Sequence, residues 1–571
     1  MMTLPTRPLK FMRQMVAPQA KLPTLLLAAL WVPGAALAQA LPDAGSILQQ
    51  VRPAPPPPPG AKGTLKIEKP FDASLPGSMP VEVTALQITG NTRFDTPTLH
   101  ALVAQAEGQR LTLAQLGQVI ARITEFYRRA GYPLARAVIP AQTIEAGVVR
   151  VEVIEAHYGQ VLLDNGSRVD TALLQSTLAP LRPGEVVAQD ILDRALLLLS
   201  DIPGVEVAAT IKAGAAVGSS DLLVNARPGP AFATSATLDN QGNRYSGRVR
   251  ASATASLFNP LGRGDELNAS VLTSGRGTSF GRLGYETLVS GAGTRLGGAV
   301  SMLNYRLGGP IEALGSHGSA QVMGLSAQQP LWRSADGSIF ARWQAGRTRL
   351  RDHVDASGIR NDRHTDGGTL TLSGNRSDGW LAGGTTIYSL GWTAGRVAFD
   401  DAEAGAADAA TARTQGSFSK WSLALSRQQA LSSRDVLAVS VFGQWANANL
   451  DSSEKLSAGG PSGVRGYDTG VLPGDSGQLA RMEWRRELGE LGTGRWQSTV
   501  FVDGARMTIN RQPWAAGANR ATLRGAGVAL AWASAQGWQA RVTVAAPLGA
   551  VPELAQTHRS TRVWAEAGWH Y

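Results

Sequence analysis

Residues 437–445 read LAVSVFGQW, and apolar side chains alternate there with small or polar ones. Successive side chains of a β-strand point to opposite faces of its sheet, so this stretch predicts a strand with one apolar and one polar face. The apolar face carries Leu437, Val439 and Val441, and the other face carries Ser440 and Gln444. Such a strand suits a transmembrane β-barrel, whose wall meets lipid outside and a polar lumen inside.

The same pattern extends from about residue 230 to the C-terminus. Alternating segments such as ELNASVLTS and FGRLGYETLVS are separated by glycine-rich turns, and helical spacing is absent. A strand of about 10 residues with its turn takes roughly 20 residues, so this region predicts an antiparallel transmembrane β-barrel of about 16 strands. A soluble β-sandwich or propeller is the alternative architecture for such a series of strands.

Aromatic residues favour the barrel. Apart from Trp31, every tryptophan lies between Trp332 and Trp569, as expected for aromatic girdles at the two membrane interfaces. The chain ends in STRVWAEAGWHY, where alternation leads through Trp569 to a terminal Tyr571. This ending is typical of the closing strand of bacterial outer-membrane barrels, so Trp569 and Tyr571 are interpreted as the barrel-closure signal.

Two units with the same order of elements precede the barrel. Residues 81–156 have the pattern strand, helix, helix, strand, strand, with a strongly amphipathic helix over 113–132. Residues 157–229 repeat that order, and a repeat of roughly 75 residues indicates a duplicated small module. The predicted fold class is therefore mixed: two α+β modules of βααββ order, followed by a barrel over 230–571.

The first 80 residues divide into three segments. Residues 1–38 combine a basic start, an apolar stretch and an Ala-Leu-Ala ending, a pattern that predicts a secretory signal peptide cleaved after Ala38 or Ala40, with a retained anchor as the alternative. Residues 39–52 include LPDAGSILQQVR, which predicts a short helix. Residues 53–80 include five consecutive prolines, which favour an extended linker. The chain is therefore expected to work outside the cytoplasm.

Composition excludes several classes of protein. The 571 residues include no cysteine, which rules out disulfide frameworks, thiolate zinc sites and cysteine nucleophiles. The net charge is +10, but no basic patch with interleaved aromatic residues indicates a nucleic-acid partner. A GxxxxGK[ST] sequence is absent, so nucleotide hydrolysis is not the expected energy source. No cofactor or metal is expected, since the seven histidines lack ligand spacing.

Three short strings match functional motifs by chance. GTSFG (277–281) has the spacing of a nucleophile elbow, but that motif requires a strand-to-helix turn and here lies between alternating strands. GDSG (474–477) resembles a protease motif but lacks a fitting histidine. Strand counting places GRGD (262–265) on the periplasmic end of the barrel, out of reach of a host. The sequence therefore predicts no enzyme.

Two further stretches carry chemistry. GGPSGVRGY (459–467) places one arginine and one tyrosine in a glycine-rich loop. FVDGAR (501–506) places Phe501 and Asp503 two residues apart, and therefore on one face of a strand. That face is expected to be the lumenal one.

In this order, the modules, the barrel and the two stretches resemble the POTRA-plus-barrel superfamily of outer-membrane transporters. Two modules, the proline linker and the strings DNQG (239–242) and LGRGDEL (261–267) resemble, more narrowly, the two-partner secretion transporters of the haemolysin secretion/activation type. Gly504 stands one place before the usual glycine of the strand motif FxDxG. The residues that match the loop and strand motifs are Val464, Arg465, Gly466 and Tyr467, with Phe501 and Asp503.

This resemblance implies a monomeric pore in outer-membrane lipid, with its POTRA modules in the periplasm. It would secrete one large partner exoprotein, of haemolysin, adhesin or toxin type. In the family, the loop tip reaches back into the lumen and its arginine pairs with the wall aspartate. Arg465 can give Asp503 two parallel hydrogen bonds, which lysine cannot. A surface ion pair of small energetic effect is the alternative interpretation.

Partner capture is predicted at the first module, where an extended segment of the exoprotein would add a strand to an exposed sheet edge. The expected edge is strand 135–140 beside the helix of 113–132, and the helix within 41–52 would plug the lumen. A barrel-assembly insertase, a passive porin and an outer-membrane enzyme are the alternatives. The predicted partner-binding residues are Val119, Ile123, Phe126 and Val138.

Overall fold

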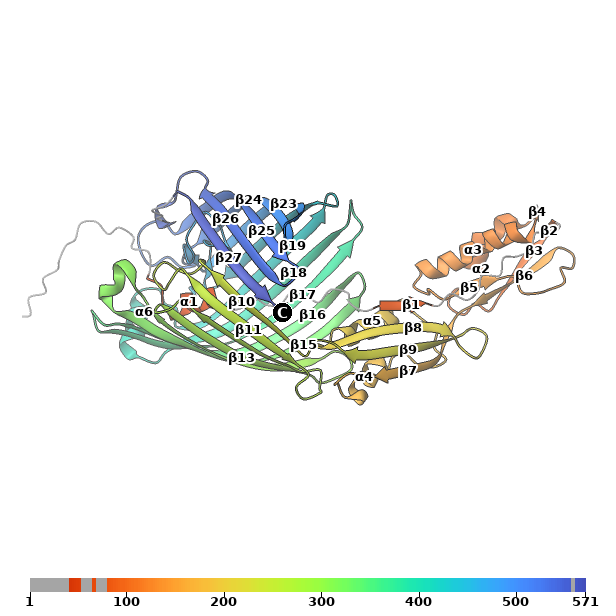
Figure 1. The fold of residues 1–571 in the computed structure, drawn as a ribbon, viewed down its shortest axis with the longest axis horizontal. Helices are drawn as coiled ribbons and strands as arrows, with labels where there is room; N and C mark the ends of the chain where they lie inside the picture. The colour runs from red at the N-terminus through yellow and green to blue at the C-terminus, as the bar shows by residue number, and fades with distance from the viewer. Residues whose placement is uncertain (1–40, 53–63, 68–79, 556–559) are drawn as a thin grey trace, which may run out of the picture. The chain divides into compact units, whose positions relative to one another are not determined.

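The computed structural model describes four stretches of the chain (Figure 1): 41–52, 64–67, 80–555 and 560–571. The signal peptide predicted over residues 1–38 and most of the predicted linker 53–80 lie outside these stretches. Within the described stretches, no helix is long and apolar enough to cross a membrane.

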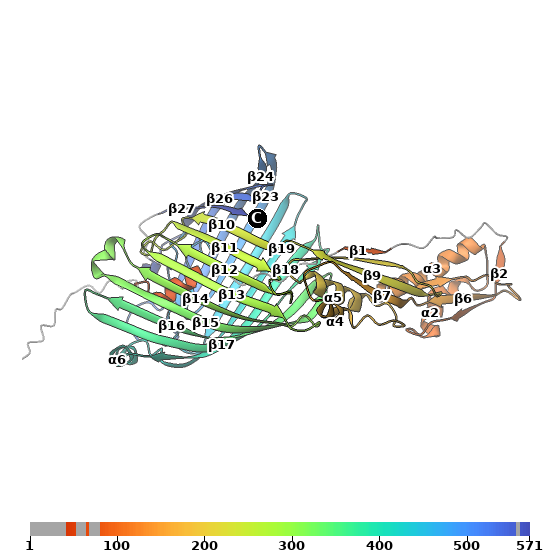
Figure 2. The same cartoon turned by 60° about the horizontal axis from the view of Figure 1, so that its bottom comes forward.

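Residues from 232 onward form a closed antiparallel β-barrel of 16 strands, each paired with its neighbours in chain order (Figures 1 and 2). This architecture confirms the prediction of a barrel and excludes a sandwich or propeller. The strands are β10 (Phe232–Asp239), β11 (Arg250–Phe258), β12 (Glu266–Thr273), β13 (Thr278–Leu288), β14 (Arg295–Arg306), β15 (Ser316–Ser334), β16 (Gly337–Val354), β17 (Ile359–Asp378), β18 (Gly384–Phe399), β19 (Gly416–Ala430), β20 (Asp435–Ala446), β23 (Ser476–Leu491), β24 (Gly494–Thr508), β25 (Arg520–Ser534), β26 (Trp538–Pro547) and β27 (Arg562–His570).

The barrel wall has the two faces that alternation requires. On β20, Val439 and Val441 are exposed on the outer face, whereas Gln444 is 5% exposed on the inner face. Trp445 also lies outside, and it pairs in register with Trp421 of β19, which pairs with Trp392 of β18. These three exposed indoles form a continuous row, as an aromatic girdle requires.

The wall closes where β27 pairs with β10. The backbone of Tyr571 exchanges two hydrogen bonds with Thr234, at 3.2 and 2.9 Å. Its ring stacks on Phe232 with centroids 5.3 Å apart, and Trp569 lies in register with Ala236. The aromatic ending of the sequence therefore lies along the seam of the barrel.

The first module contains a three-stranded sheet in the order β3-β6-β5, packed against helices α2 and α3. β3 runs parallel to the central β6, and β5 runs antiparallel to it. A two-stranded ribbon of β2 and β4 adds to the predicted elements. The elements are β2 (Val81–Val83), β3 (Ala85–Thr89), α2 (Thr96–Val103), η1 (Ala104–Ala106), β4 (Gln109–Leu111), α3 (Leu113–Arg129), β5 (Arg136–Val138) and β6 (Val148–Ile154).

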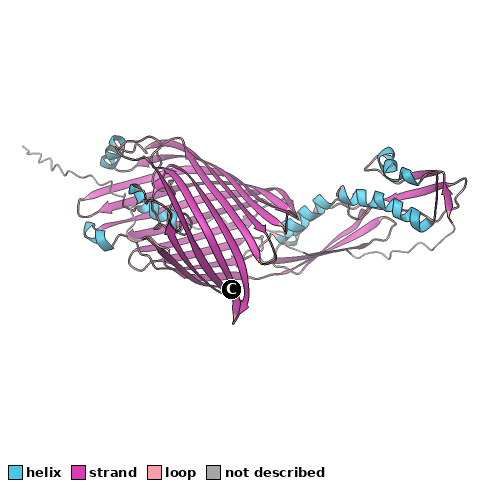
Figure 3. Cartoon of the chain, turned by 90° about the horizontal axis from the view of Figure 1, so that it is seen from above, coloured by secondary structure: helices cyan, strands magenta, loops and turns pink. Residues whose placement is uncertain are grey.

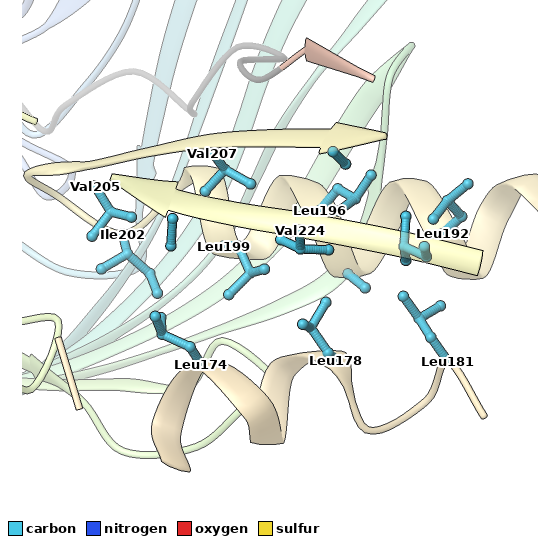
Figure 4. Close-up of a cluster of buried hydrophobic side chains, with 14 of the residues drawn as sticks. Leu174, Leu178, Leu181, Leu192, Leu196, Leu199, Ile202, Val205, Val207 and Val224 are labelled. Carbon is cyan, nitrogen blue, oxygen red and sulfur yellow. The ribbon is translucent and has the colours of Figure 1, made fainter. Parts of the chain in front are cut away.

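The second module repeats this topology. Its sheet has the order β7-β9-β8, with β7 parallel and β8 antiparallel to the central β9. Leucines of both helices pack against the sheet (Figure 4), and the core residues include Leu174, Leu192, Leu199 and Val224. The elements are β7 (His157–Asn165), α4 (Thr171–Leu178), α5 (Gln189–Ser200), β8 (Val205–Ala213) and β9 (Ser219–Pro228).

One part of the predicted linker forms a strand. β1 (Thr64–Ile67) pairs in parallel with β8 and so becomes the outer strand of the second module's sheet. The sequence predicts an extended linker over 53–80, but it does not predict that these four residues pair with a sheet. The apolar Leu65, which packs against the core of the second module, explains why pairing occurs here.

Remaining elements belong to the ends and the interior of the barrel. The GRGD turn contacts the second module, since the N–H of Asp170 donates to the carbonyl of Gly262 at 2.8 Å. Helix α1 lies among the barrel strands (Figure 3). These elements are α1 (Ala44–Val51), η2 (Gly309–Leu314), α6 (Ala402–Ala410), β21 (Leu456–Ser457), β22 (Pro473–Gly474) and η3 (Glu553–Ala555).

Candidate functional site

The long connection between β20 and β23, residues 447–475, packs inside the barrel. Val464 and Tyr467 are fully buried, and they form one cluster with the wall residues Leu479 and Leu523. Burial of apolar side chains, each contributing about 1.5–3 kcal/mol, holds this loop against the wall. We call residues 447–475 the lumenal loop.

Gly466 allows the loop tip to touch the wall. A Cβ atom at this position would lie 2.8 Å from the backbone of both Ala546 and Pro547 at the end of β26. Backbone atoms cannot yield as a flexible side chain can, so this contact requires glycine. The VRGY sequence therefore combines two buried apolar residues, one cation and one close backbone approach.

Arg465 forms the predicted two-pronged contact with Asp503. Its Nε donates to Oδ2 at 2.8 Å and its Nη2 donates to Oδ1 at 2.7 Å. Its backbone N–H also donates to Oδ2, at 3.1 Å. Arg465 is 4% exposed and Asp503 is 1% exposed. The pair is therefore buried, which excludes the alternative of a surface ion pair.

Phe501 completes the wall side of this contact. The guanidinium carbon of Arg465 lies 3.4 Å from the centroid of the Phe501 ring, a cation–π arrangement. Phe501 is 2% exposed, and its ring lies over Gly527 of β25, where a Cβ atom would be 2.7 Å from Cζ. A Cβ at Gly504 would meet only the carbonyl of Leu523, at 3.9 Å. The close approach near Phe501 is therefore made at Gly527 and not at Gly504.

Sequence reasoning missed two partners of Arg465. Its Nη1 donates to Glu483 Oε1 at 2.7 Å, and its carbonyl accepts the indole N–H of Trp564 at 2.9 Å. Glu483 also accepts from Arg485 at 2.8 and 2.6 Å. The alternation of Arg481, Glu483 and Arg485 along β23 was an available signal, because charges two residues apart share the lumenal face.

A second buried arginine, Arg363 of β17, lies 2% exposed on the inner wall. Its Nε donates to Asp451 of the lumenal loop at 2.5 Å and its Nη1 to Asp352 of β16 at 2.7 Å. Its Nη2 donates to Asp43 at 2.8 Å and to Ser452 at 3.0 Å. One guanidinium therefore joins the wall, the lumenal loop and the residue that begins helix α1.

Helix α1 covers an apolar patch on the inner wall. Asp43 caps its first turn by accepting from the N–H of Ser46 at 2.9 Å, and the N–H of Ala44 donates to Asp352 at 2.7 Å. Ile47 and Leu48 are each 1% exposed. Barrel interiors are usually polar, but the wall residues against this helix are Phe280, Leu303, Tyr305, Leu307, Ala320 and Leu350.

The comparison with known proteins follows the same division of the chain. The profile of the haemolysin secretion/activation proteins ShlB/FhaC/HecB matches residues 218–532, which is more than half of the sequence. The chain belongs to this family. A second profile, the ShlB-type POTRA domain, matches residues 81–156.

Individual transporter proteins match the chain over most of their length. The heme/hemopexin transporter protein HuxB of Haemophilus influenzae is 28% identical over 531 residues, which are 91% of this chain and 93% of HuxB. The outer membrane transporter CdiB of Escherichia coli is 24% identical over 472 residues, 79% of this chain and 76% of CdiB. The solved structure of Escherichia coli CdiB has a TM-score of 0.69 at 21% identity, covering 88% and 93% of the two chains.

Membership of the haemolysin secretion/activation family defines the general role. The chain is an outer-membrane transporter of two-partner secretion, with its POTRA region in the periplasm, and it is not an enzyme. Members of the family work with secreted exoprotein partners. Among the described residues, no group of three or more histidine, aspartate or glutamate side chains could hold a metal ion.

A cavity of about 810 Å³ lies beside the Arg465 pair in this family member. Charged and polar side chains line it, including Arg481, Glu483, Arg485 and Arg541. Trp564 contributes one aromatic surface. The wall of this cavity therefore offers many hydrogen-bonding side chains next to the Arg465 pair.

The predicted partner-binding residues of the first module do not form one surface. Ile123 is fully buried in the core of this POTRA domain, so the prediction that it contacts a partner is wrong. Val119 and Phe126 are partly buried against the same core. Val138 is half-buried on the edge strand β5, where the N–H of its neighbour Ala137 donates to Thr124 of α3 at 3.0 Å.

Buried charge also stabilises the POTRA domain. Glu155, 3% exposed, accepts from the backbone N–H groups of Thr92 and Arg93 at 2.8 and 2.9 Å and from the Tyr127 hydroxyl at 2.7 Å. Burial alone would raise the pKa of Glu155, but these hydrogen bonds and the Thr92 hydroxyl outweigh burial and lower it. The carboxylate therefore ties the end of the module to the turn before α2.

Proposed function

We propose that this transporter moves one large exoprotein through its barrel lumen, and that the lumenal loop must be held by Arg465 for the transporter to work. The buried, bidentate pair with Asp503 carries this proposal. The loop is rich in glycine, so it has high conformational entropy when free. One rigid contact near its tip restrains it without blocking the adjoining cavity, since Arg465, Arg481 and Glu483 face that cavity together.

Helix α1 is the plug of the resting pore in this proposal. Its buried face covers the apolar patch of the inner wall, and Asp43 holds its first turn to Arg363. The plug also touches the lumenal loop, because a Cβ atom at Gly45 would lie 2.6 Å from the backbone nitrogen of Ser453. Departure of the plug would therefore leave Asp451 and Ser452 of the loop bound to Arg363 without the contacts that Asp43 and Gly45 now add.

The periplasmic modules capture the partner as an unfolded chain by strand addition, which provides affinity through main-chain hydrogen bonds. In the first module, the half-buried Val138 on edge strand β5 and the partly buried Val119 and Phe126 remain the proposed contacts. Folding of the exoprotein outside the cell supplies direction, without nucleotide hydrolysis. The transporter works as a monomer surrounded by outer-membrane lipid.

Secretion of the large exported protein expected from the neighbouring gene tests the central contact. Arg465→Ala and Asp503→Ala should each lower the secreted amount at least tenfold, because breaking a buried ion pair costs about 3–5 kcal/mol. The double variant should secrete little less than either single variant, since the two residues act as one unit. Simple addition of the two effects would show that they act independently and would overturn the proposed lock.

Arg347→Ala is the matched control for this experiment. Arg347 also makes two hydrogen bonds to one carboxylate, Asp366, at 2.6 and 2.7 Å. That pair is 47% exposed on each side and lies on the outer face of the barrel. An exposed pair contributes at most about 1 kcal/mol, so secretion should stay near the wild-type amount.

A further inference from the structure

The outer strand of the second module's sheet is β1, which lies before the first module in the sequence. Four consecutive register pairs run from Thr64↔Ala208 to Ile67↔Ile211, and all are parallel. β8 continues for three residues before and two residues after the paired stretch. The edge of β8 is therefore a site that accepts an extended segment, and β1 fills less than half of it.

Side-chain contacts show what this site selects. Leu65 of β1 packs partly buried against the core of the second module, whereas Lys66 is exposed. On β8, Val207, Ala209 and Ile211 point into that core. An incoming strand is therefore recognised by its backbone, together with an apolar residue at every second position beside these three side chains.

The first module has the topologically equivalent edge, but it is smaller and partly covered. β5 occupies there the place of β8, because both strands lie antiparallel beside the central strand of their sheet. β5 has only three residues, and Thr124 already accepts from the N–H of Ala137. β8 has nine residues and an edge that a strand is observed to pair with.

We propose that the β8 edge is a docking site for an extended, alternately apolar segment of the exported polypeptide, and that β1 occupies this site until the exoprotein displaces it. This inference rests on the proposed function, since it presumes an exoprotein that passes the modules. Displacement is favourable because a longer segment can pair with all nine residues of β8, whereas β1 pairs with four. Each added residue pair supplies further main-chain hydrogen bonds, and the edge of β8 that accepts them already exists.

Release of β1 also changes the reach of the plug. Twelve residue steps separate Arg52, after the end of α1, from Thr64, which allows about 40 Å at full extension. Without β1 pairing, the next strand along the chain is β2, which begins at Val81, and the 29 steps from Arg52 allow about 100 Å. Docking of the exoprotein on β8 would therefore lengthen the tether of the plug more than twofold.

A reversible crosslink tests the proposal in the full chain. Lys66 and Thr210 are register partners, and the natural sequence contains no cysteine, so Lys66→Cys with Thr210→Cys creates one disulfide between β1 and β8. Oxidised cells should secrete the exoprotein at least tenfold less than wild type, and a reducing agent should restore secretion. Unchanged secretion with the disulfide fully formed would overturn the proposal.

The matched control crosslinks two strands that stay paired. Glu206 and Arg227 are exposed register partners on β8 and β9, so Glu206→Cys with Arg227→Cys forms a disulfide without closing the β8 edge. Oxidation of this variant should leave secretion unchanged. If this control also lost secretion, any crosslink in the second module would abolish its function. The loss of secretion in the chain crosslinked between β1 and β8 would then count against the proposal.

Two further variants distinguish docking of the exoprotein on β8 from restraint of the plug through β1. Deleting residues 41–52 in the crosslinked chain removes the plug, so secretion should stay low if the exoprotein needs the β8 edge. Recovery of secretion would mean that β1 acts only by restraining the plug, which contradicts docking. Leu65→Asp should release β1 and lower, several-fold, the exoprotein concentration that half-saturates the full chain in lipid nanodiscs. Unchanged half-saturation would also contradict docking.

Failure of this inference differs from failure of the proposed function. If the wild-type chain and the control crosslink do not secrete the exoprotein at all, the proposed transport function is wrong. If both secrete it and the locked Lys66→Cys with Thr210→Cys chain secretes equally well, transport stands and only the role of the β8 edge is wrong.

Discussion

Arg465 and Arg363 are both buried in the barrel lumen, and each holds to the wall a segment that is not part of it. Arg465 gives two parallel hydrogen bonds to one carboxylate and a third side-chain bond to Glu483. Arg363 divides its donors among three carboxylates and Ser452. The Arg465 contact fixes one geometry. The Arg363 contact joins three elements, with one hydrogen bond each to a carboxylate of the wall, of the lumenal loop and of the start of helix α1.

The charge around the two arginines differs as well. Arg465 lies with Arg481 and Arg485 against Asp503 and Glu483, so three cations face two carboxylates. Among the residues that the structure describes, Arg363 is the one cation paired with Asp43, Asp352 and Asp451. Excess carboxylates repel one another in a buried site. If the proposed function is correct, this difference predicts a loop contact that persists and a contact of helix α1 that is released more easily.

Replacement of each arginine by lysine should give the largest difference between the two arginine contacts. Arg465→Lys should lower exoprotein secretion about as much as Arg465→Ala, at least tenfold, because an ammonium cannot reproduce the planar two-pronged contact. Arg363→Lys should keep most plug retention, since three separate carboxylates suit a point charge with three donors. Single-channel conductance and secretion measure the two effects. If lysine preserved function equally well at both positions, the proposed difference between the two arginine contacts would be wrong.

Arg363→Ala should open the resting pore. The change removes the cation that ties Asp43 to the inner wall and leaves buried carboxylates unpaired, which is strongly unfavourable, so Asp43 and with it helix α1 should leave the wall. Single-channel conductance in lipid bilayers should rise to the value of a variant that lacks residues 41–52. Combining the two changes should add nothing further. An Arg363→Ala pore that conducts like wild type would show that the apolar patch alone retains the plug.

Removing one carboxylate should act in opposite directions at the two sites. Asp451→Asn relieves repulsion around Arg363 while its amide oxygen can still accept from Nε, so open-pore events should become several-fold rarer. Glu483→Gln removes a counter-charge from the arginine-rich site and should lower secretion several-fold. Bilayer recordings count the open-pore events of Asp451→Asn, and secreted yield measures the effect of Glu483→Gln. If both changes strengthened or both weakened the arginine contact, the charge argument would be refuted.

Trp564→Phe should have the smallest effect. It removes the indole hydrogen bond to the carbonyl of Arg465 but keeps an aromatic ring of similar position. Loss of one such bond costs about 1 kcal/mol, so secretion should fall no more than about fivefold. Arg465→Ala combined with Trp564→Phe should secrete no less than Arg465→Ala. A larger loss in the combination would mean that Trp564 acts on transport by another route.

Much of the architecture could be predicted because it depends on local periodicity. The alternation in LAVSVFGQW gave β20 its lipid and lumen faces, and the helical spacing over 113–132 corresponds to α3. The Arg465–Asp503 contact was predicted from a family motif together with strand period. The contacts of Glu483 and Trp564 were not predicted. The alternation of Arg481, Glu483 and Arg485 placed Glu483 on the lumenal face but did not identify its partner, and Trp564 lies 99 residues from Arg465 on a strand whose register a single sequence does not specify.

The sequence by itself determined the barrel, the repeated modules and the residue types that a loop contact would need, since these follow from the direction in which neighbouring side chains point. Apart from the Arg465–Asp503 pair, only the tertiary structure decided which charges meet and which edges are filled. Ile123 lies on the apolar stripe of its amphipathic helix, and only the packing of that stripe against the sheet of the module shows that it is out of reach of a partner. Residues 64–67 lie in a proline-rich region but complete the sheet at β8. Both outcomes depend on surfaces formed by distant segments, and backbone pairing across such distances leaves no local periodic signal.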